Sequence, residues 1–471
     1  MRKLWPFALA ILACAAATPG TVTAQEPVVP PSPLPVTSPV VTVNNAPGDQ
    51  LDAHVSGDLV SYTDQGGNFA VHYFRFSTGH DAAIPGGPAL TDFLSDVSGE
   101  RITFTRLDDS FRGHIFVFDA ATASLTEVDP VAGSHRIRSA IGSNTVAFID
   151  LTTAFTNVLS IADLANPGPS LRFPGPGFGA QSPQVAPDGN TVVWEQCRSI
   201  FDCDVLRAVR TAGTWTVSAV ANASNNPDTD GTWIVYDSNR AGSPTGWDIY
   251  FRPVAGGVER QLTIPGVQWN PSISGGVISF ESRATAAALG DVFVYVIATN
   301  MLYQVTSTPF VDDTLTDVTV LDNGDIRVVW AANASLVDFD YNTYATTFTP
   351  AGVVHYEICL LYDPLVAKKA GSAYPIKLQL CDAGGLNLSS PSIALHAVSL
   401  TRTSDDAPGP LDDTGNANPD FDFRYDASPE GYVFNLSLKC QGAACFTTGT
   451  YDLNFTVGSD PTVYSAPFAV K

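Results

Sequence analysis

The chain has 471 residues, of which 45% are hydrophobic and 15% charged, and its formal net charge is −23. A surface this negative repels phosphate backbones and anionic headgroups, which argues against binding to nucleic acid and against docking on an acidic membrane. The 38 glycines and 34 prolines argue against a helical bundle and predict many short strands joined by turns.

Residues 1–24 have the pattern of a secretory signal peptide. Two basic residues precede an apolar run from Leu4 to Ala17, and Val22-Thr23-Ala24 places small residues where a signal peptidase cleaves. A lipoprotein anchored through Cys14 is the alternative. No later segment approaches 18 consecutive apolar residues, so we expect no transmembrane segment. We therefore expect an exported protein that is secreted, periplasmic or attached to the cell surface, and the few lysines and the repeats suggest a bacterium.

Residues 25–48 are rich in proline, with seven between Gln25 and Pro47. Such a composition predicts an extended, polyproline-like linker. We expect it to hold the first folded domain away from whatever the N-terminus contacts.

Residues 49–350 repeat one short pattern, a strand followed by a glycine turn and then a strand that ends in an aromatic residue. The instances are residues 55–62, 97–104, 141–148, 187–194, 230–236, 274–280 and 322–330. Their turns are roughly 42 to 48 residues apart, which is the spacing of four-stranded propeller blades. The pattern predicts an all-β, seven-bladed β-propeller, with six blades left open if the last unit is an extra, and Val40–Val43 available as a closing strand.

Four segments of this region resemble the TolB-like, WD-repeat-like propeller family. They are Asn270-Pro271-Ser272-Ile273-Ser274-Gly275, Asp237-Ser238-Asn239-Arg240, Trp247-Asp248-Ile249-Tyr250 and Arg260-Gln261-Leu262-Thr263. In that family the repeated aspartates and glycines shape turns. The resemblance implies a periplasmic, secreted or surface-attached scaffold, often one that binds protein.

Residues 353–471 predict a second domain with about seven strands, which fits a small β-sandwich. Cys359-Leu360-Leu361-Tyr362-Asp363, residues 375–382, residues 431–436 and residues 449–455 resemble a bacterial surface Ig-like domain. The resemblance implies a spacer or adhesion module at the C-terminus of an exported protein.

Six cysteines remain after the signal peptide. Proximity favours the pairs Cys197–Cys203, Cys359–Cys381 and Cys440–Cys445 among the 15 pairings that six cysteines allow. A zinc site is the rival interpretation, but the chain has no C-x-x-C and no histidine close to these cysteines in sequence. Export favours disulfides.

A search for catalytic motifs is negative, since G-x-S-x-G, H-E-x-x-H and the phosphate-binding G-x-x-x-x-G-K are all missing. The innermost strands of a propeller converge on its axis, however, and several polar residues occupy equivalent places there or begin the loops before them. These candidate ligand-binding residues at the mouth of the channel are His54, Asp96, Gln184, Asp228, Asn226, Asn270 and Ser272. Two of the acids could act as general acid and base; the alternative is that they cap turns.

A calcium site is the one cofactor that the sequence suggests. An acidic loop carries oxygen ligands at nearly alternate positions, as encircling calcium loops do. Its candidate ligands are Asp412, Asp413, Asn416, Asn418, Asp420 and Asp422. The alternative is a solvated acidic loop without a metal.

The leading functional hypothesis from these patterns is an exported, non-catalytic binding or scaffold protein. Its propeller would bind an extracellular or periplasmic protein or a polysaccharide. The alternative is a polysaccharide-degrading enzyme with an acidic site at the propeller axis. Fold resemblance by itself does not choose between them.

Overall fold

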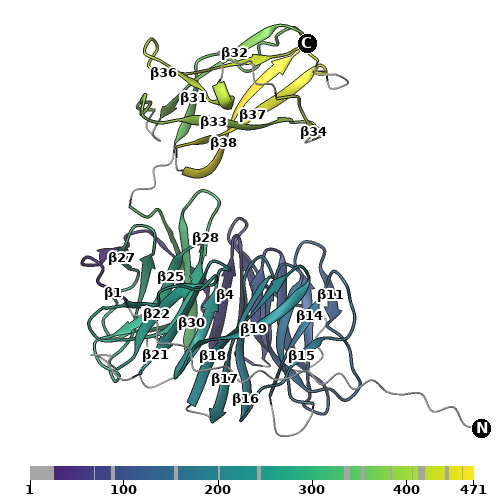
Figure 1. The fold of residues 1–471 in the computed structure, drawn as a ribbon, viewed down its shortest axis with the longest axis vertical. Coiled ribbons are helices and arrows are strands. Elements are labelled where there is room, and N and C mark those ends of the chain that lie inside the picture. Colours follow the sequence, from purple (N-terminus) through teal and green to yellow (C-terminus); the bar gives the residue numbers. More distant parts are fainter. Residues whose placement is uncertain are drawn as a thin grey trace, which may run out of the picture. The chain divides into compact units, whose positions relative to one another are not determined.

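The computed structural model describes residues 26–67, 69–85, 91–152, 157–199, 202–240, 246–333, 340–351, 356–381, 385–405, 407–411, 419–440, 445–458 and 460–471. The described chain is all-β and contains no α-helix (Figure 1). It divides into two compact units, the first made of Met1–Thr319 with Arg327–Thr347 and the second of Val320–Ile326 with Phe348–Lys471. No helix in the described ranges is long and apolar enough to cross a membrane.

The described strands of the first unit form seven sheets, numbered here from the first to the seventh along the chain. The first four are β4–β7 (Gln50–Ser56, Leu59–Asp64, Ala70–Arg75, His80–Ala83), β8–β11 (Asp92–Ser98, Arg101–Leu107, Gly113–Asp119, Ser124–Glu127), β12–β15 (Arg136–Gly142, Thr145–Asp150, Val158–Asp163, Leu171–Phe173) and β16–β19 (Gly179–Val185, Thr191–Ser199, Asp202–Thr211, Thr214–Ala221).

The remaining three sheets each include a strand from the N-terminal segment. They are β20–β23 (Ser224–Thr229, Trp233–Ser238, Asp248–Pro253, Arg260–Leu262) with β1 (Glu26–Val28), β24–β27 (Val267–Ser274, Val277–Arg283, Asp291–Val296, Met301–Gln304) with β2 (Leu34–Pro35), and β28–β30 (Asp312–Val320, Ile326–Asn333, Tyr341–Phe348) with β3 (Val40–Asn44).

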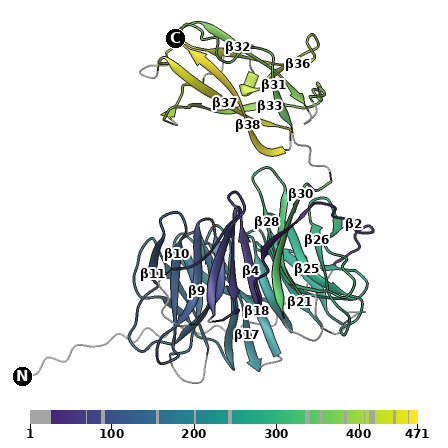
Figure 2. The same cartoon turned by 180° about the vertical axis from the view of Figure 1, so that it is seen from behind.

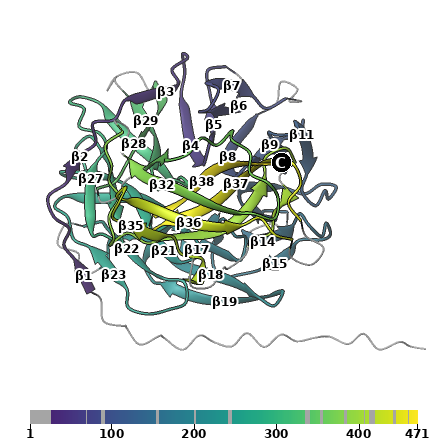
Figure 3. The same ribbon diagram turned by 90° about the horizontal axis from the view of Figure 1, so that it is seen from above.

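The sheets are arranged radially, with β4 and β8 toward the centre of the unit and β7 and β11 at its periphery (Figure 3). Hydrophobic cores lie at most of the boundaries between successive sheets. One of them joins Val55 and Tyr62 of the first sheet to Val329 and Ala345 of the seventh, so the ring closes. A single sheet cannot bury both of its faces, and the ring of neighbours buries them.

The proline-rich N-terminal segment is not the free spacer that its composition predicts. β1 pairs in parallel with β23, and β2 pairs in parallel with β27, each as an added outer strand. Proline is tolerated in these places because an edge strand needs only some of its N–H groups for pairing. The segment thereby covers two sheet edges that would otherwise remain open.

The predicted closing strand is confirmed. β3 pairs antiparallel with β30, with Val41 opposite Ala345 (Figure 2). The outermost strand of the seventh sheet therefore comes from the start of the chain, and the side chain of Val43 is buried in the core between the seventh and first sheets.

The second unit contains two four-stranded sheets and a short 3-10 turn. The sheets are β31-β32-β36-β35 (Glu357–Leu360, Ala373–Cys381, Gly431–Ser437, Arg424–Asp426) and β34-β33-β37-β38 (Ala407–Pro408, Leu395–Arg402, Gly449–Val457, Asp460–Val470), and the turn is η2 (Pro419–Phe421). Period-two alternation aims Ile376 and Phe434 of one sheet and Leu453 and Phe455 of the other into one shared core.

All three predicted disulfides are confirmed: Cys197–Cys203, Cys359–Cys381 and Cys440–Cys445. The first joins opposed residues of β17 and β18, and the second joins β31 to β32. Three disulfides are typical of proteins in an oxidising compartment. They also replace the zinc interpretation, because the six thiols are consumed.

Candidate functional site

Each innermost strand of the first unit repeats one local geometry. A residue other than glycine with positive φ occurs once in each of the seven strands, at Asp52, Leu94, Arg138, Ser182, Asn226, Asn270 and Leu315. Two residues later comes the position that we call the axial ring. Its members are His54, Asp96, Ala140, Gln184, Asp228, Ser272 and Asp317, which lie 42 to 45 residues apart. The shift in register beside the positive φ, seen for example between Asn225 and Asp228, bends the strand there.

Three aspartates of the axial ring connect neighbouring sheets. Asp96 accepts the N–H of Val97 at 2.8 Å and that of Ile141 in the next sheet at 2.7 Å. Asp228 makes the same two bonds in the fifth and sixth sheets, and Asp317 makes them in the seventh and first. Each carboxylate therefore satisfies one backbone donor on either side of a boundary between sheets.

His54 lies among three carboxylates. Its Nδ1 is 3.6 Å from oxygens of both Asp96 and Asp317, and its Nε2 is 3.9 Å from Asp52. The His54 side chain is 24% exposed and that of Asp317 15%, so water reaches the group. Burial opposes the imidazolium, but the hydrogen bond to Asp317 and the surrounding negative charges outweigh it and raise the pKa of His54 to about 10.

The same contacts displace the pKa values of the two neighbouring acids, Asp317 and Asp96, in opposite directions. Burial opposes ionisation of Asp317, but His54, Ser272 and the N–H of Val55 outweigh it and lower the pKa of this carboxyl group. Asp96 has only the charge of His54 and two backbone N–H groups, and burial raises its pKa to about 6.

Ser272 joins Asp317 to Asp228. The Ser272 hydroxyl lies 3.0 Å from Asp228 Oδ2 and in hydrogen-bond contact with Asp317 Oδ1. Burial and the charge of Asp317 raise the pKa of Asp228 to about 7. Near neutral pH Asp228 is therefore partly protonated while Asp317 is ionised.

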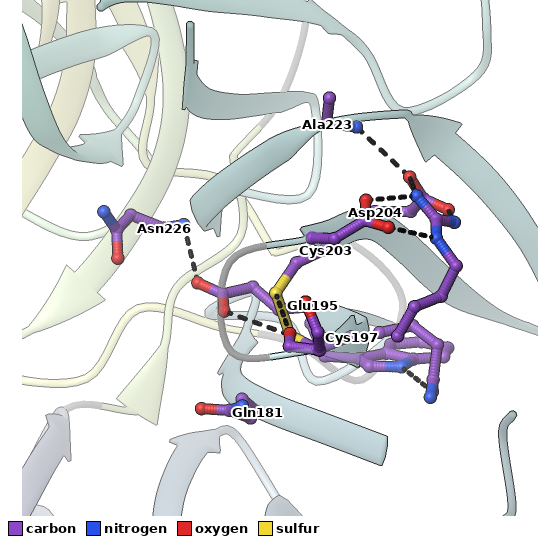
Figure 4. Close-up of a disulfide and its surroundings, with 12 residues drawn as sticks. Gln181, Glu195, Cys197, Cys203, Asp204, Ala223 and Asn226 are labelled. Atoms are coloured by element: carbon purple, nitrogen blue, oxygen red, sulfur yellow. Dashed lines mark hydrogen bonds and ion pairs between the residues drawn. A yellow bond between two sulfur atoms is a disulfide. The ribbon is translucent and has the colours of Figure 1, made fainter. Parts of the chain in front are cut away.

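A second group of acids lies on the neighbouring strands of the fourth to sixth sheets. Glu195 accepts the N–H of Asn226 at 2.8 Å, and Asp237 accepts from the Asn226 amide at 2.8 Å and from the N–H of Asn270 at 3.0 Å. Burial raises the pKa of Asp237 to about 7. Figure 4 shows Glu195 between Asn226 and the Cys197–Cys203 disulfide, which joins two strands of the same sheet.

The structure brings together four of the seven predicted ligand-binding residues, namely His54, Asp96, Asp228 and Ser272. Gln184 occupies the equivalent ring position and is half-buried, but in the described part of the chain no bond joins it to those four. Asn226 and Asn270 occur at the positive-φ positions, which asparagine tolerates well, and bind the second group of acids.

Sequence reasoning missed Asp317 and Asp52. The candidates were found by counting back from each turn glycine, and the turn of the seventh sheet is longer, so that Asp317 comes seven residues before Gly324. Counting from one inner strand to the next would have found it, because Asp317 follows Ser272 by 45 residues. Asp52 would have followed as the residue two positions before His54.

The predicted calcium loop is only partly described. Asp412, Asp413, Asn416 and Asn418 lie outside the described residues. Asp420 has a positive φ of 54° in η2, and Asp422 accepts a hydrogen bond from His396, with 2.8 Å between Nδ1 and Oδ1. Asp422 therefore already has an ionisable partner.

Comparisons with known proteins identify similar structures but no family. No family model and no curated protein matches the sequence. The β-propeller domain of the Trilobed protease from Pyrococcus furiosus has 13% identity and a TM-score of 0.49, covering 64% of this chain and 95% of that one. An oligogalacturonate lyase in complex with manganese has 16% identity and a TM-score of 0.47, covering 70% and 99%.

Two further solved structures extend the picture. An acylaminoacyl peptidase from Pyrococcus horikoshii has 11% identity and a TM-score of 0.48, covering 71% of this chain and 58% of that one. A putative TolB from Agrobacterium tumefaciens has 17% identity and a TM-score of 0.36, covering 59% and 87%. The likeness is one of fold, and the activities named are those of the neighbours.

These neighbours correct one expectation from the sequence. A non-catalytic binding or scaffold protein was the leading hypothesis, but the similar structures are mostly peptidases and a lyase, which are enzymes. The hypothesis failed because turn motifs report how a propeller is built and carry no information about the groups at its axis.

Proposed function

We propose that the protein is a polysaccharide-degrading enzyme whose acid–base groups are Asp228 and Asp317. The observation that supports this most is the pair itself: two carboxyl groups on either side of the Ser272 hydroxyl, with pKa values displaced in opposite directions. Neighbouring carboxyl groups whose pKa values are driven apart are typical of glycoside hydrolysis.

The proposed roles follow from which of the two carboxyl groups carries a proton. Asp228, with a pKa of about 7, is the proton donor to the leaving oxygen, and Asp317 is the ionised partner on the other side. Because both bond to one hydroxyl, their oxygens are no more than two hydrogen-bond lengths, roughly 6 Å, apart. That separation is closer to the about 5 Å of retaining glycosidases than to the wider spacing of inverting ones. His54 is a positioning residue that keeps Asp317 ionised.

The charge of the site narrows the range of polysaccharides that it can accept. Asp52, Asp96 and Asp317 surround the cation of His54, and Ser272 joins Asp317 to Asp228. The whole chain has a net charge of −23. Like charges repel strongly in a partly desolvated site. Polymers of uronic acids or sulfated sugars are therefore disfavoured, and neutral or amino polysaccharides are favoured.

Release of reducing ends from a panel of neutral, amino and uronate polysaccharides tests the proposal. We expect activity on the first two classes, with Asp228→Asn and Asp317→Asn each lowering kcat at least 100-fold. Asp109→Asn, which changes an exposed carboxylate outside the ring, is the matched control and should leave the rate unchanged. Circular dichroism establishes that the variants fold. Activity that survives in both ring variants, or no activity on any polymer, overturns the proposal.

The proposal includes the finer architecture and the location of the protein. We infer that the seven sheets are seven blades of a TolB-like propeller at residues 49–350, and that residues 353–471 form an Ig-like sandwich. The supporting facts are the seven sheets of the first unit and the two sheets with a common core in the second. Export after cleavage of residues 1–24 fits the three disulfides.

A further inference from the structure

A pocket of about 480 Å³ opens beside the axial ring, between the first and second sheets and the start of β28. Its lining residues are Leu51, Asp52, Thr63, Gln65, Phe69, Thr91, Phe93, Leu94, Leu107 and Leu315. Three of these, Asp52, Leu94 and Leu315, are the positive-φ residues two positions before His54, Asp96 and Asp317. The volume is within the range of about 300–1,000 Å³ that is usual for ligand pockets.

The wall of this pocket is largely apolar and is already ordered. Six of the ten lining residues are leucine or phenylalanine. The hydroxyl of Thr63 accepts the N–H of Leu94 at 3.2 Å, and the N–H of Leu107 donates to the carbonyl of Thr91 at 3.0 Å. A bare sugar would leave several hydroxyl groups without partners against such a wall, which is costly. The pocket therefore fits a sugar unit with an apolar substituent.

Asp52 is the ionisable member of the lining, and it connects the pocket to the catalytic pair. Its carboxylate is 32% exposed and 3.9 Å from His54, which in turn contacts Asp317. Burial raises the pKa of Asp52, against the opposing charges of His54 and Arg138. A carboxyl group in this state accepts a hydrogen bond from an N–H, and in its protonated form donates one to a carbonyl. An amide group offers both.

We propose that this pocket binds an N-acylated amino-sugar unit, with the acyl group against Phe69 and Phe93 and its amide N–H on Asp52. The inference rests on the proposed function and specifies its substrate: a polysaccharide of N-acetylated amino sugars. The acyl amide is uncharged, so it enters the acidic site without the repulsion that excludes uronates. A hydrophobic peptide side chain is the competing occupant.

Calorimetric binding to the mature chain tests this with hexamers of N-acetylglucosamine, glucosamine and glucose. The Asp228→Asn variant is used so that turnover does not interfere. We expect the N-acetylated hexamer to bind at least tenfold more tightly than the other two, which is the usual contribution of one small apolar group in a pocket. Phe69→Ala should remove most of this preference. Phe178→Ala is the matched control, because Phe178 is exposed to 45% and Phe69 to 39%, and it should have no effect.

Asp52→Asn separates the amide contact from the apolar wall. Asparagine tolerates the positive φ of residue 52, so the backbone is retained while the carboxyl group is lost. We expect weaker binding of the N-acetylated hexamer, with no change for the glucose hexamer. Equal affinities for the three hexamers overturn the inference, as does an equal effect of Phe69→Ala and Phe178→Ala, or tight binding of a leucine-rich peptide in place of the N-acetylated hexamer.

Hydrolysis by the wild-type chain distinguishes the two proposals. Selective binding of the N-acetylated hexamer without cleavage of any hexamer supports the pocket and refutes the glycosidase. Cleavage of all three hexamers at equal rates supports the glycosidase and refutes the acyl pocket.

Discussion

The pH dependence of stability should reveal the His54 cluster directly. The pKa of His54 rises from 6.5 to about 10 on folding, so between these values the folded chain holds a proton that the unfolded chain has released. The stabilisation is fully present below pH 6.5 and is lost as the pH rises through about 10. The acids Asp96 and Asp228, with pKa values of about 6 and 7, also hold extra protons in the folded chain. Their contribution falls as the pH rises through those values, so most of that change occurs below pH 7.5.

The interval from pH 7.5 to 9.5 therefore reports mainly on His54. One proton held by the folded state alone lowers the free energy of unfolding by about 1.4 kcal/mol per pH unit. Over two units the loss is at most about 2.7 kcal/mol, and we expect about 1–2.5 kcal/mol because His54 is 24% exposed.

Urea unfolding followed by tryptophan fluorescence measures this change. Six of the seven tryptophans lie between Trp194 and Trp330 and the seventh is Trp5, so the signal of the mature chain comes from the first unit. We expect His54→Gln to be less stable than wild type at pH 7.5 and to approach it by pH 9.5. His114→Gln is the control, since His114 is 20% exposed and paired with Glu127 on another strand. If wild type and His54→Gln change in parallel from pH 7.5 to 9.5, the reasoning is wrong.

Three further predictions follow from the same contacts. Asp317→Asn should destabilise the first unit by about 1–3 kcal/mol, because its hydrogen bonds across the ring weaken, and should flatten the same alkaline slope; a normal slope in this variant would assign the proton elsewhere. A chain that starts at residue 46 should lose several kcal/mol of stability relative to one that starts at residue 37, because only the longer chain keeps β3 against β30; equal urea midpoints would contradict this. If the loop of residues 412–422 binds calcium, excess calcium should raise the melting transition of the second unit in calorimetry, whereas an unchanged transition compared with chelator would end that hypothesis.

Much of the fold was predictable because its signals are local. The glycine turns mark the sheets, and the cysteine pairs close loops of 5, 6 and 22 residues. The pairing of Glu26–Val28 with β23 was not predictable, because a parallel partner more than 200 residues away leaves no pattern in a proline-rich segment. Such pairing depends on which sheet edges remain open once the ring has formed.

The site was predictable only as far as the repeat is regular. His54, Asp96, Asp228 and Ser272 follow from equivalent positions in the repeat. Asp317 does not, because the turn that follows it is longer. The displaced pKa values leave no signal in the sequence, because they depend on burial and on contacts between different sheets. The contacting residues are 42 to 45 positions apart in successive sheets, or meet only because the ring closes.

The acids of the axial ring stabilise the fold through their hydrogen bonds, but this structural role does not explain why Asp228 and Asp317 are paired. Asp96 uses its two oxygens on two backbone N–H groups, which is sufficient for a structural role. The equivalent ring positions of the third and fourth sheets hold Ala140 and Gln184, so the architecture does not require an axial-ring carboxylate in every sheet. Asp228 and Asp317 differ from Asp96 because both also bind the Ser272 hydroxyl, which brings two like charges together at a cost in stability. A pair that is retained at such a cost, and that the fold can omit elsewhere, is better explained by chemistry at the axis than by packing.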